Sequence, residues 1–149
     1  MSCREKQMKK VLPVLTAAFL VAFVGHTYAA DAGMIALQDI ASKWSAAYNS
    51  GDAKKLAELY SPNAIFLSGT LGALRGRTEI ENAIAGLVKR APKIMLNPVE
   101  AHENENVVWG YWDYAIPNGP AGYGGVTAVK EGEGWLINLH VSNVKPKKE

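Results

Sequence analysis

The stretch that decides the fold of this chain is Trp44 to Ile80, WSAAYNSGDAKKLAELYSPNAIFLSGTLGALRGRTEI. In order, its pattern predicts the end of an amphipathic helix, an Asn-Ser-Gly-Asp break, a short helix, a Ser-Pro turn, an apolar strand, a glycine-rich loop and the start of a third helix. Elements in that order form a curled sheet with helices laid across its open side. Such an architecture encloses a pocket.

Three helices are expected. The first covers residues 32–49, because apolar side chains recur there at spacings of three and four residues and form one stripe. Gly51 suits the left-handed position after the helix end, and Asp52 can cap a second helix over residues 53–60. Pro62 cannot continue that helix, so residues 61–63 are expected to form a turn. The third helix begins near Thr78, in a capping-box pattern, and ends before Pro92.

The remaining residues predict strands. One short strand is expected at 64–67, before a loop over 68–76. Four more are expected at 93–102, 107–115, 123–131 and 135–144, separated by polar or glycine-containing turns. Three early helices with one strand, followed by four antiparallel strands, predict an α+β fold with one curved sheet.

The first 29 residues are expected to be a secretory signal peptide. Four basic residues stand in residues 1–10, an apolar run of about fifteen residues follows, and Thr27-Tyr28-Ala29 offers small residues at a cleavage site. The run is short for a membrane-spanning helix, which needs about 20 apolar residues; the alternative is an uncleaved N-terminal anchor. We therefore expect a single domain over residues 30–149 and a periplasmic or secreted location.

Removing that segment changes the charge of the protein. The whole chain has 16 basic and 14 acidic residues and a net charge of +2, whereas residues 30–149 have 12 and 13 and a net charge of −1. No basic patch for nucleic acid is expected, nor a stable membrane contact after cleavage. Because the one cysteine is Cys3, the mature chain has no disulfide or thiolate site.

The order of elements, with AYNSGDAKKLAELYSPNAIFL, then LRGRTEIENAI, then GWLINLHVSN, resembles the nuclear-transport-factor-2-like superfamily. It is most similar to the small bacterial SnoaL-like and DUF4440-type members, including the SgcJ/EcaC group. The resemblance implies a cone, meaning a strongly curved mixed sheet wrapped around the first helix and open at one end. It also implies a homodimer formed through the sheet. The same fold serves enzymes, binding proteins and assembly modules, so it does not fix the function.

The ketosteroid-isomerase-like members of that superfamily use a carboxylate base and a tyrosine on the first helix. The resemblance aligns Ser68 with the base and Trp44 with the tyrosine. Serine is not basic near neutral pH, and indole donates one hydrogen bond but accepts none. This departure argues against that mechanism but leaves another base open.

Two other residues are candidate catalytic groups. Asp113 follows an apolar aromatic run; inside the cone, burial would raise its pKa and make it an acid. The alternative is an aspartate that faces water or pairs with a cross-strand lysine. His140 alternates with Asn138 and Ser142 on the last strand, opposite an apolar face made by residues 135, 137, 139 and 141. Three positions are open for that polar face: it lines the cavity, it lies in a dimer interface, or it faces solvent.

The expected ligand-binding residues share aromatic or small polar side chains on the inner side of the predicted cone. They are Trp44, Tyr48, Tyr60, Ser68, Trp112, Asn138 and Ser142. Pockets for small apolar ligands are built from such residues, although core packing also explains the aromatic ones. No metal site is expected, because no two histidines have ligand spacing, and no cofactor is expected.

Three functions are therefore open. The first is binding of a small, largely apolar molecule in the cone. The second is an isomerase- or dehydratase-like enzyme that uses Asp113 or His140, and the third is an assembly module without a ligand.

Overall fold

The structure, a computed structural model, describes residues 25–146 of the 149. Its three helices are α1 (Gly25–Asn49), α2 (Ala53–Ala57) and α3 (Gly76–Arg90). Its six strands are β1 (Tyr60–Ser68), β2 (Gly72–Arg75), β3 (Met95–Asn104), β4 (Val107–Ala115), β5 (Ala121–Glu131) and β6 (Gly134–Val144). Residues 1–24 of the expected signal peptide lie outside the described part, and residues 25–29 belong to α1.

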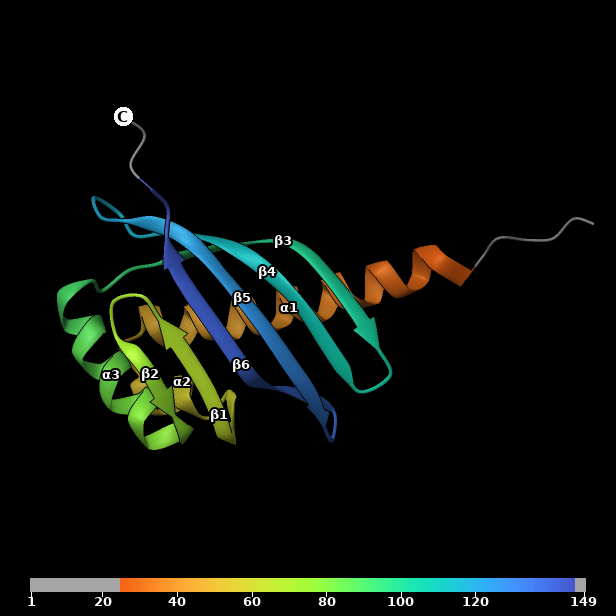
Figure 1. The fold of residues 1–149 in the computed structure, drawn as a ribbon, viewed down its shortest axis with the longest axis horizontal. Coiled ribbons are helices and arrows are strands. Elements are labelled where there is room, and N and C mark those ends of the chain that lie inside the picture. The colour runs from red at the N-terminus through yellow and green to blue at the C-terminus, as the bar shows by residue number, and fades with distance from the viewer. Residues whose placement is uncertain (1–24, 147–149) are drawn as a thin grey trace, which may run out of the picture.

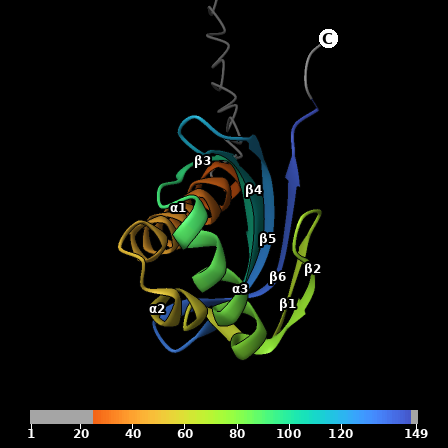
Figure 2. The same cartoon turned by 90° about the vertical axis from the view of Figure 1, so that its left-hand side faces the viewer.

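The six strands form one sheet in the order β2-β1-β6-β5-β4-β3. Only β1 and β6 run parallel among these neighbours; the other pairs are antiparallel. The sheet curves around α1, and all three helices lie on its concave side (Figures 1 and 2). This confirms the α+β cone that the sequence predicted. We call the helix-covered side the inner face of the sheet and the opposite side the outer face.

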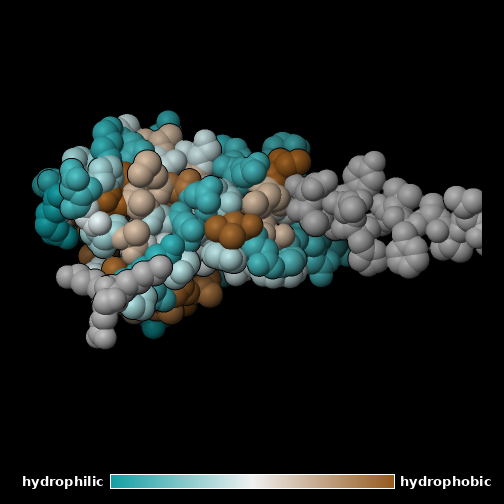
Figure 3. Space-filling model, turned by 90° about the horizontal axis from the view of Figure 1, so that it is seen from above, coloured by the Kyte–Doolittle hydropathy of each residue, from teal (hydrophilic) through white to brown (hydrophobic). Residues whose placement is uncertain are grey.

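The stripe predicted on the first helix is the part that enters the core. Leu37, Ile40, Trp44 and Tyr48 are all buried, at three- and four-residue spacing. Farther toward the N-terminus, Gly33 lets α1 approach β3 closely, because a Cβ at Gly33 would lie 2.9 Å from the backbone carbonyl carbon of His102. The helix is thereby seated on the sheet. On the surface seen in Figure 3, hydrophobic residues form small clusters among hydrophilic residues.

Three local predictions near the start of the sheet were wrong. The second helix ends at Ala57, and the expected turn at 61–63 lies inside β1. The pairing of β1 with β6 is irregular there. Tyr60 pairs with Ile137 and Ile65 with Leu139, so β1 advances five residues while β6 advances two. Pro62 fits this bulge because it has no N–H to give to a ladder. The predicted loop at 68–76 also contains β2, which pairs back on β1 as a hairpin.

A second bulge in β6 changes which side chains face inward. Thr127 pairs with Leu139 and Ala128 with Ile137, so Asn138 is an extra residue in β6. An extra residue reverses the alternation of side chains along a strand. Ile137 and His140 are therefore both buried, whereas Leu139 lines the outer face. The prediction that residues 135, 137, 139 and 141 share one apolar face was wrong for this reason.

Within residues 25–146, no helix is both long enough and apolar enough to span a membrane. The same residues contain no group of three or more histidine, cysteine, aspartate or glutamate side chains placed to hold a metal ion.

Candidate functional site

The candidate site is a cavity of about 350 Å³ between the inner face of the sheet and the helices, which we call the cone pocket. Most of its lining is apolar or aromatic. The lining residues are Trp44, Phe66, Ser68, Thr70, Leu71, Ile84, Leu87, Arg90, Ala91, Ile94, Leu96, Trp112, Tyr114, Ile116, Pro120, His140, Ser142 and Val144. Arg90 is the one charged side chain among them, and no carboxylate lines the cavity. Apolar walls with a few polar groups are the usual composition of a small-molecule site.

A chain of hydrogen bonds connects three buried aromatic side chains at this pocket. The Trp44 Nε1–H donates to Tyr60 Oη at 2.9 Å, and Tyr60 Oη lies 2.8 Å from Nδ1 of His140. Since indole is only a donor, Tyr60 accepts from Trp44. Its own hydrogen then goes to His140 Nδ1, because within residues 25–146 the phenol has no other partner. The network therefore assigns the neutral His140 tautomer that carries its proton on Nε2.

Burial keeps this network uncharged. It lowers the pKa of His140 to about 3, because the imidazolium would lose its hydration inside the core. Burial also raises the pKa of the Tyr60 phenol above its ordinary range, against a smaller lowering by the hydrogen bond from Trp44. Near neutral pH His140 is thus a hydrogen-bond donor at Nε2, and that protonated nitrogen cannot act as a base.

Aromatic rings hold His140 in place. The Phe66 ring stacks on the imidazole with centroids 4.3 Å apart and an interplanar angle of 4°. Trp112 meets the imidazole edge to face, with centroids 5.4 Å apart. Trp44 meets it edge to face on another side, at 6.0 Å. These contacts fix the ring plane, so the direction of the Nε2–H is fixed too.

Tyr48 and Tyr60 lie behind the pocket wall and support it. Tyr48 stacks on Trp44 with centroids 5.3 Å apart and donates its hydroxyl hydrogen to the carbonyl of Ala91 at 2.7 Å. Burial raises the pKa of the Tyr48 phenol. The backbone carbonyl of Tyr60 accepts a hydrogen bond from Arg77 Nε at 2.7 Å. Neither tyrosine lines the cavity, although both were expected there.

Ser68 and Ser142 both line the pocket, as expected, and are partners in the register of β1 and β6. Ser68 also has a local role: its Oγ accepts from the backbone N–H groups of Thr70 and Leu71, each at 3.3 Å. The serine that aligns with the missing base is thus engaged in the β1–β2 turn.

Asp113 and Asn138 do not reach the cone pocket. Asp113 lies on the outer side of β4, where Lys145 Nζ donates to its Oδ1 at 3.1 Å. The pair is partly exposed, and the bond to Asp113 raises the pKa of Lys145. Of the two alternatives given for Asp113, the structure shows the aspartate paired with a lysine and not the acid that points into the cone. Asn138, the bulge residue, is exposed and donates to Ser61 Oγ at 3.3 Å.

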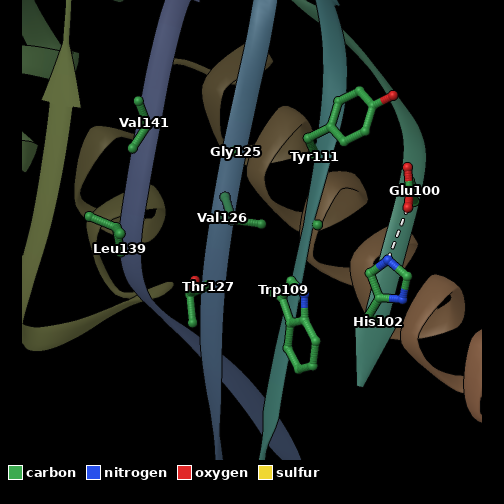
Figure 4. Close-up of a pocket in the computed structure, with 10 residues that line it drawn as sticks. Glu100, His102, Trp109, Tyr111, Gly125, Val126, Thr127, Leu139 and Val141 are labelled. Atoms are coloured by element: carbon green, nitrogen blue, oxygen red, sulfur yellow. Dashed lines mark hydrogen bonds and ion pairs between the residues drawn. The ribbon is translucent and has the colours of Figure 1, made fainter. Parts of the chain in front are cut away.

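A second hollow, of about 440 Å³, lies on the outer face (Figure 4). Its walls include Trp109, Tyr111, Leu139 and Val141, and the imidazole Nε2 of His102 lies 3.0 Å from Glu100 Oε1 at its edge. Trp109 is 42% exposed, whereas Trp112 in the cone pocket is 1% exposed. The outer hollow is therefore an open surface, and the cone pocket is the better enclosed site.

Sequence reasoning missed several residues of the pocket. Phe66 could have been found, because Ala64, Phe66 and Ser68 alternate along β1 toward one face. Leu96 and Ile94 come from the segment that enters β3, where no periodic signal separates inner from outer positions. Arg90 lies in the last turn of α3, and only the packing of that helix places it at the pocket.

The comparisons with known proteins agree with this fold. The sequence model of the SnoaL-like domain matches residues 41–133 of this chain. No curated protein matches it at a significant level.

Solved structures match over most of the chain. A domain of unknown function with a cystatin-like fold from Nostoc punctiforme is 18% identical, covers 78% of this chain and 79% of its own, and has a TM-score of 0.66. An NTF2-like protein from Novosphingobium aromaticivorans is 12% identical, with coverages of 76% and 82% and a TM-score of 0.64. A putative calcium/calmodulin-dependent protein kinase II association domain from Xanthomonas campestris is 24% identical, with coverages of 76% and 86% and a TM-score of 0.62. At these identities the similarity shows the fold alone.

Proposed function

This chain belongs to the SnoaL-like domain family, and on that premise we propose that it is an exported protein that binds a small, largely apolar molecule in the cone pocket. The observation that carries the proposal is the cavity of about 350 Å³, whose walls are buried aromatic and aliphatic side chains. Transfer of apolar surface from water into such a cavity is favourable by about 25 cal/mol per Å². Burial of its apolar surface would therefore favour binding of an apolar ligand, and no ion pair with the protein would be needed.

An enzymatic role for the same pocket has less support. Asp113 lies on the outer face, and no aspartate or glutamate lines the cavity. His140 is neutral, with Nδ1 occupied by Tyr60 and Nε2 protonated. Removal of a proton next to a carbonyl needs a base within hydrogen-bond reach of the substrate. The geometry favours recognition of a ligand over that reaction.

The binding proposal is tested with N-phenyl-1-naphthylamine, an uncharged apolar dye whose fluorescence rises in an apolar site. Ser142→Phe fills the cone pocket from β6, so we expect the dye signal to be lost. Val141→Phe is the matched control, because the adjacent residue of the same strand lines the outer hollow. Circular dichroism checks that both variants fold. Equal dye binding by the two variants would contradict the proposal.

We include homodimerisation through the outer face in this proposal. Leu67, Trp109 and Tyr123 on that face are 40%, 42% and 47% exposed, and the helices cover only the opposite face (Figure 2). An exposed apolar surface of this kind is typical of a protein interface. One solved structure with the same fold is named as an association domain. A second copy of this chain supplies a matching apolar face.

Export is proposed from the sequence of residues 1–29 alone. Expression of the full chain in a bacterial host and mass measurement of the periplasmic fraction test it. We expect a mature protein that begins at Ala30. A chain that keeps residues 1–29 and stays with the membrane fraction would support the anchor instead.

A further inference from the structure

A third hollow, of about 310 Å³, adjoins the cone pocket, and we call it the polar recess. Five of its lining residues also line the cone pocket: Ser68, Thr70, Tyr114, Ser142 and Val144. Gly69 and Asn143 complete the lining of the recess. The two hollows therefore share a wall, and a molecule that fills the cone pocket can extend into the recess.

A glycine on β5 positions the phenol of Tyr114 at this recess. Gly122 pairs with Tyr114 on β4 and with Val144 on β6. A Cβ at Gly122 would lie 2.5 Å from Cε1 and from Cζ of Tyr114, so the ring of Tyr114 lies across the glycine. A glycine inside a strand often marks such a close approach. Because Cζ carries the hydroxyl, the polar end of the ring is brought over β5, at the recess.

The polar side chains of the recess include three with free hydrogen-bonding capacity. Ser68 is engaged in the β1–β2 turn, where its Oγ also lies 3.2 Å from Oγ1 of Thr70. In contrast, the side chains of Tyr114, Ser142 and Asn143 make no hydrogen bond within residues 25–146, and all three are at least partly exposed. A hydroxyl group both donates and accepts, and so does a carboxamide. The recess therefore offers donors and acceptors together.

This lining selects the kind of polar group that fits the recess. Among residues 25–146, no lysine, arginine, histidine, aspartate or glutamate lines it. A charged group placed there would lose hydration without gaining a counter-charge. A hydroxyl group of a ligand can donate to and accept from the same side chains, whereas a lone carbonyl could use only their donors. The chemistry of the recess thus favours an uncharged group with hydroxyls.

The cone pocket next to the recess has the opposite polarity. Phe66, Ile84 and Trp112 line the cone pocket and are buried. Thr70 and Asn143 of the recess are exposed. A ligand that occupies both hollows therefore has its apolar part in the core and its polar end toward water.

We infer that the polar recess binds the uncharged, hydroxyl-bearing end of a ligand whose apolar part fills the cone pocket. This inference rests on the proposed function, since it names the class of molecule that the cone pocket takes. Tyr114, Ser142 and Asn143 form the hydrogen bonds to the hydroxyl-bearing end, and the apolar wall of the cone pocket contacts the rest of the ligand.

The probes are 1-O-octylglycerol, octyl methyl ether and octanoate, which share the octyl chain and differ at the polar end. Dissociation constants are measured by calorimetry, with each compound below the concentration at which it forms micelles. We expect the wild-type protein to bind octylglycerol about fivefold more tightly than the ether, because only octylglycerol carries hydroxyls. In saturation-transfer NMR, the glycerol protons should receive saturation from the protein as strongly as the octyl protons do.

Two tyrosine variants isolate a hydroxyl of the recess. Tyr114→Phe removes the hydroxyl and keeps the ring, so the ratio of octylglycerol affinity to ether affinity should fall about fivefold. Tyr111→Phe is the matched control, because Tyr111 lies on the same strand but lines the outer hollow, and this ratio should remain. The NMR measurement on wild-type protein needs no variant, so it decides the question even where Tyr114→Phe does not fold.

The possible failures are distinct. If octylglycerol and the ether bind equally, or saturation reaches only the octyl protons, the recess is not the site and the proposed function stands. The same holds if Tyr114→Phe keeps the wild-type ratio of affinities. If octanoate binds more tightly than octylglycerol and Arg90→Gln removes that advantage, the polar end is an anion at Arg90 and the inference is overturned. If none of the three compounds binds, the proposed function fails and the inference falls with it.

Discussion

Tyr60 Oη lies 2.8 Å from Nδ1 of His140 and donates a hydrogen bond to that nitrogen. The two residues are 80 positions apart in the chain, on β1 and β6. This hydrogen bond sets the tautomer of His140, because Nδ1 accepts from Tyr60 and the ring proton is therefore on Nε2. Tyr60, which does not line the pocket, is thus the residue that sets the tautomer of His140 in the pocket wall.

Tyr60→Phe should destabilise the fold and disturb the tautomer of His140. The substitution leaves the Trp44 Nε1–H and His140 Nδ1 without their shared partner, and loss of a buried partner costs about 1–3 kcal/mol. Urea denaturation measures the loss, and the ¹⁵N shifts of the imidazole report the tautomer. Tyr111→Phe, on the outer face, is the control and should change stability by less than about 0.5 kcal/mol. Equal stability of the two variants would show that the network contributes nothing.

Stability should fall as the pH drops below 6.5. The pKa of His140 is near 6.5 in the unfolded chain and about 3 in the folded one, so between these values only the unfolded chain takes up the proton. The stabilisation that comes from the neutral, buried His140 is complete above pH 6.5. Below that pH it decreases by about 1.4 kcal/mol per pH unit, so the loss is about 2 kcal/mol at pH 5. The test is the free energy of unfolding of wild type and His140→Gln at pH 7 and pH 5. A pH effect of the same size in both proteins would contradict the assignment to His140.

Gly124→Ala should displace Trp112. A Cβ at Gly124 would overlap the indole nitrogen of Trp112, which is held in the core and cannot move without opening the packing. Overpacking of this kind costs about 1–3 kcal/mol. The control is Gly125→Ala, where the nearest atom to a Cβ is the carbonyl oxygen of Gly110 at 4.0 Å. Thermal unfolding compares the two; similar melting temperatures would refute the packing argument.

Trp109→Lys should separate the proposed dimer. A lysine there would place a charge in the exposed apolar surface of the outer face, and a stable interface needs about 800 Å² per partner of well-packed surface. Light scattering after size exclusion should give twice the chain mass for wild type and the single chain mass for the variant. Ile35→Lys is the control, because Ile35 is 66% exposed on α1, away from the outer face, and should leave the dimer intact. A monomeric wild type would refute this part of the proposal.

Local patterns in the sequence were sufficient for most of the elements and for the family. The stripe from Leu37 to Tyr48 is set by the 3.6-residue period of a helix, so it could be read without the structure. The same holds for β4, whose predicted bounds, 107–115, match the structure. The family resemblance, carried by residues 47–67, 74–84 and 134–143, agrees with the match of the SnoaL-like domain to residues 41–133.

Only the tertiary structure decided the site. Whether His140 faces inward depends on the extra residue Asn138, and a bulge is defined by the register of the partner strand, which a local alternation cannot reveal. Asp113 and Trp112 are adjacent in β4, yet one pairs with Lys145 outside and the other lines the cone, since neighbouring side chains of a strand point to opposite faces. The sequence alone thus determined a cone with an aromatic lining. The tautomer of His140 in the pocket wall required the fold, because Tyr60 comes from 80 residues away to bind the imidazole.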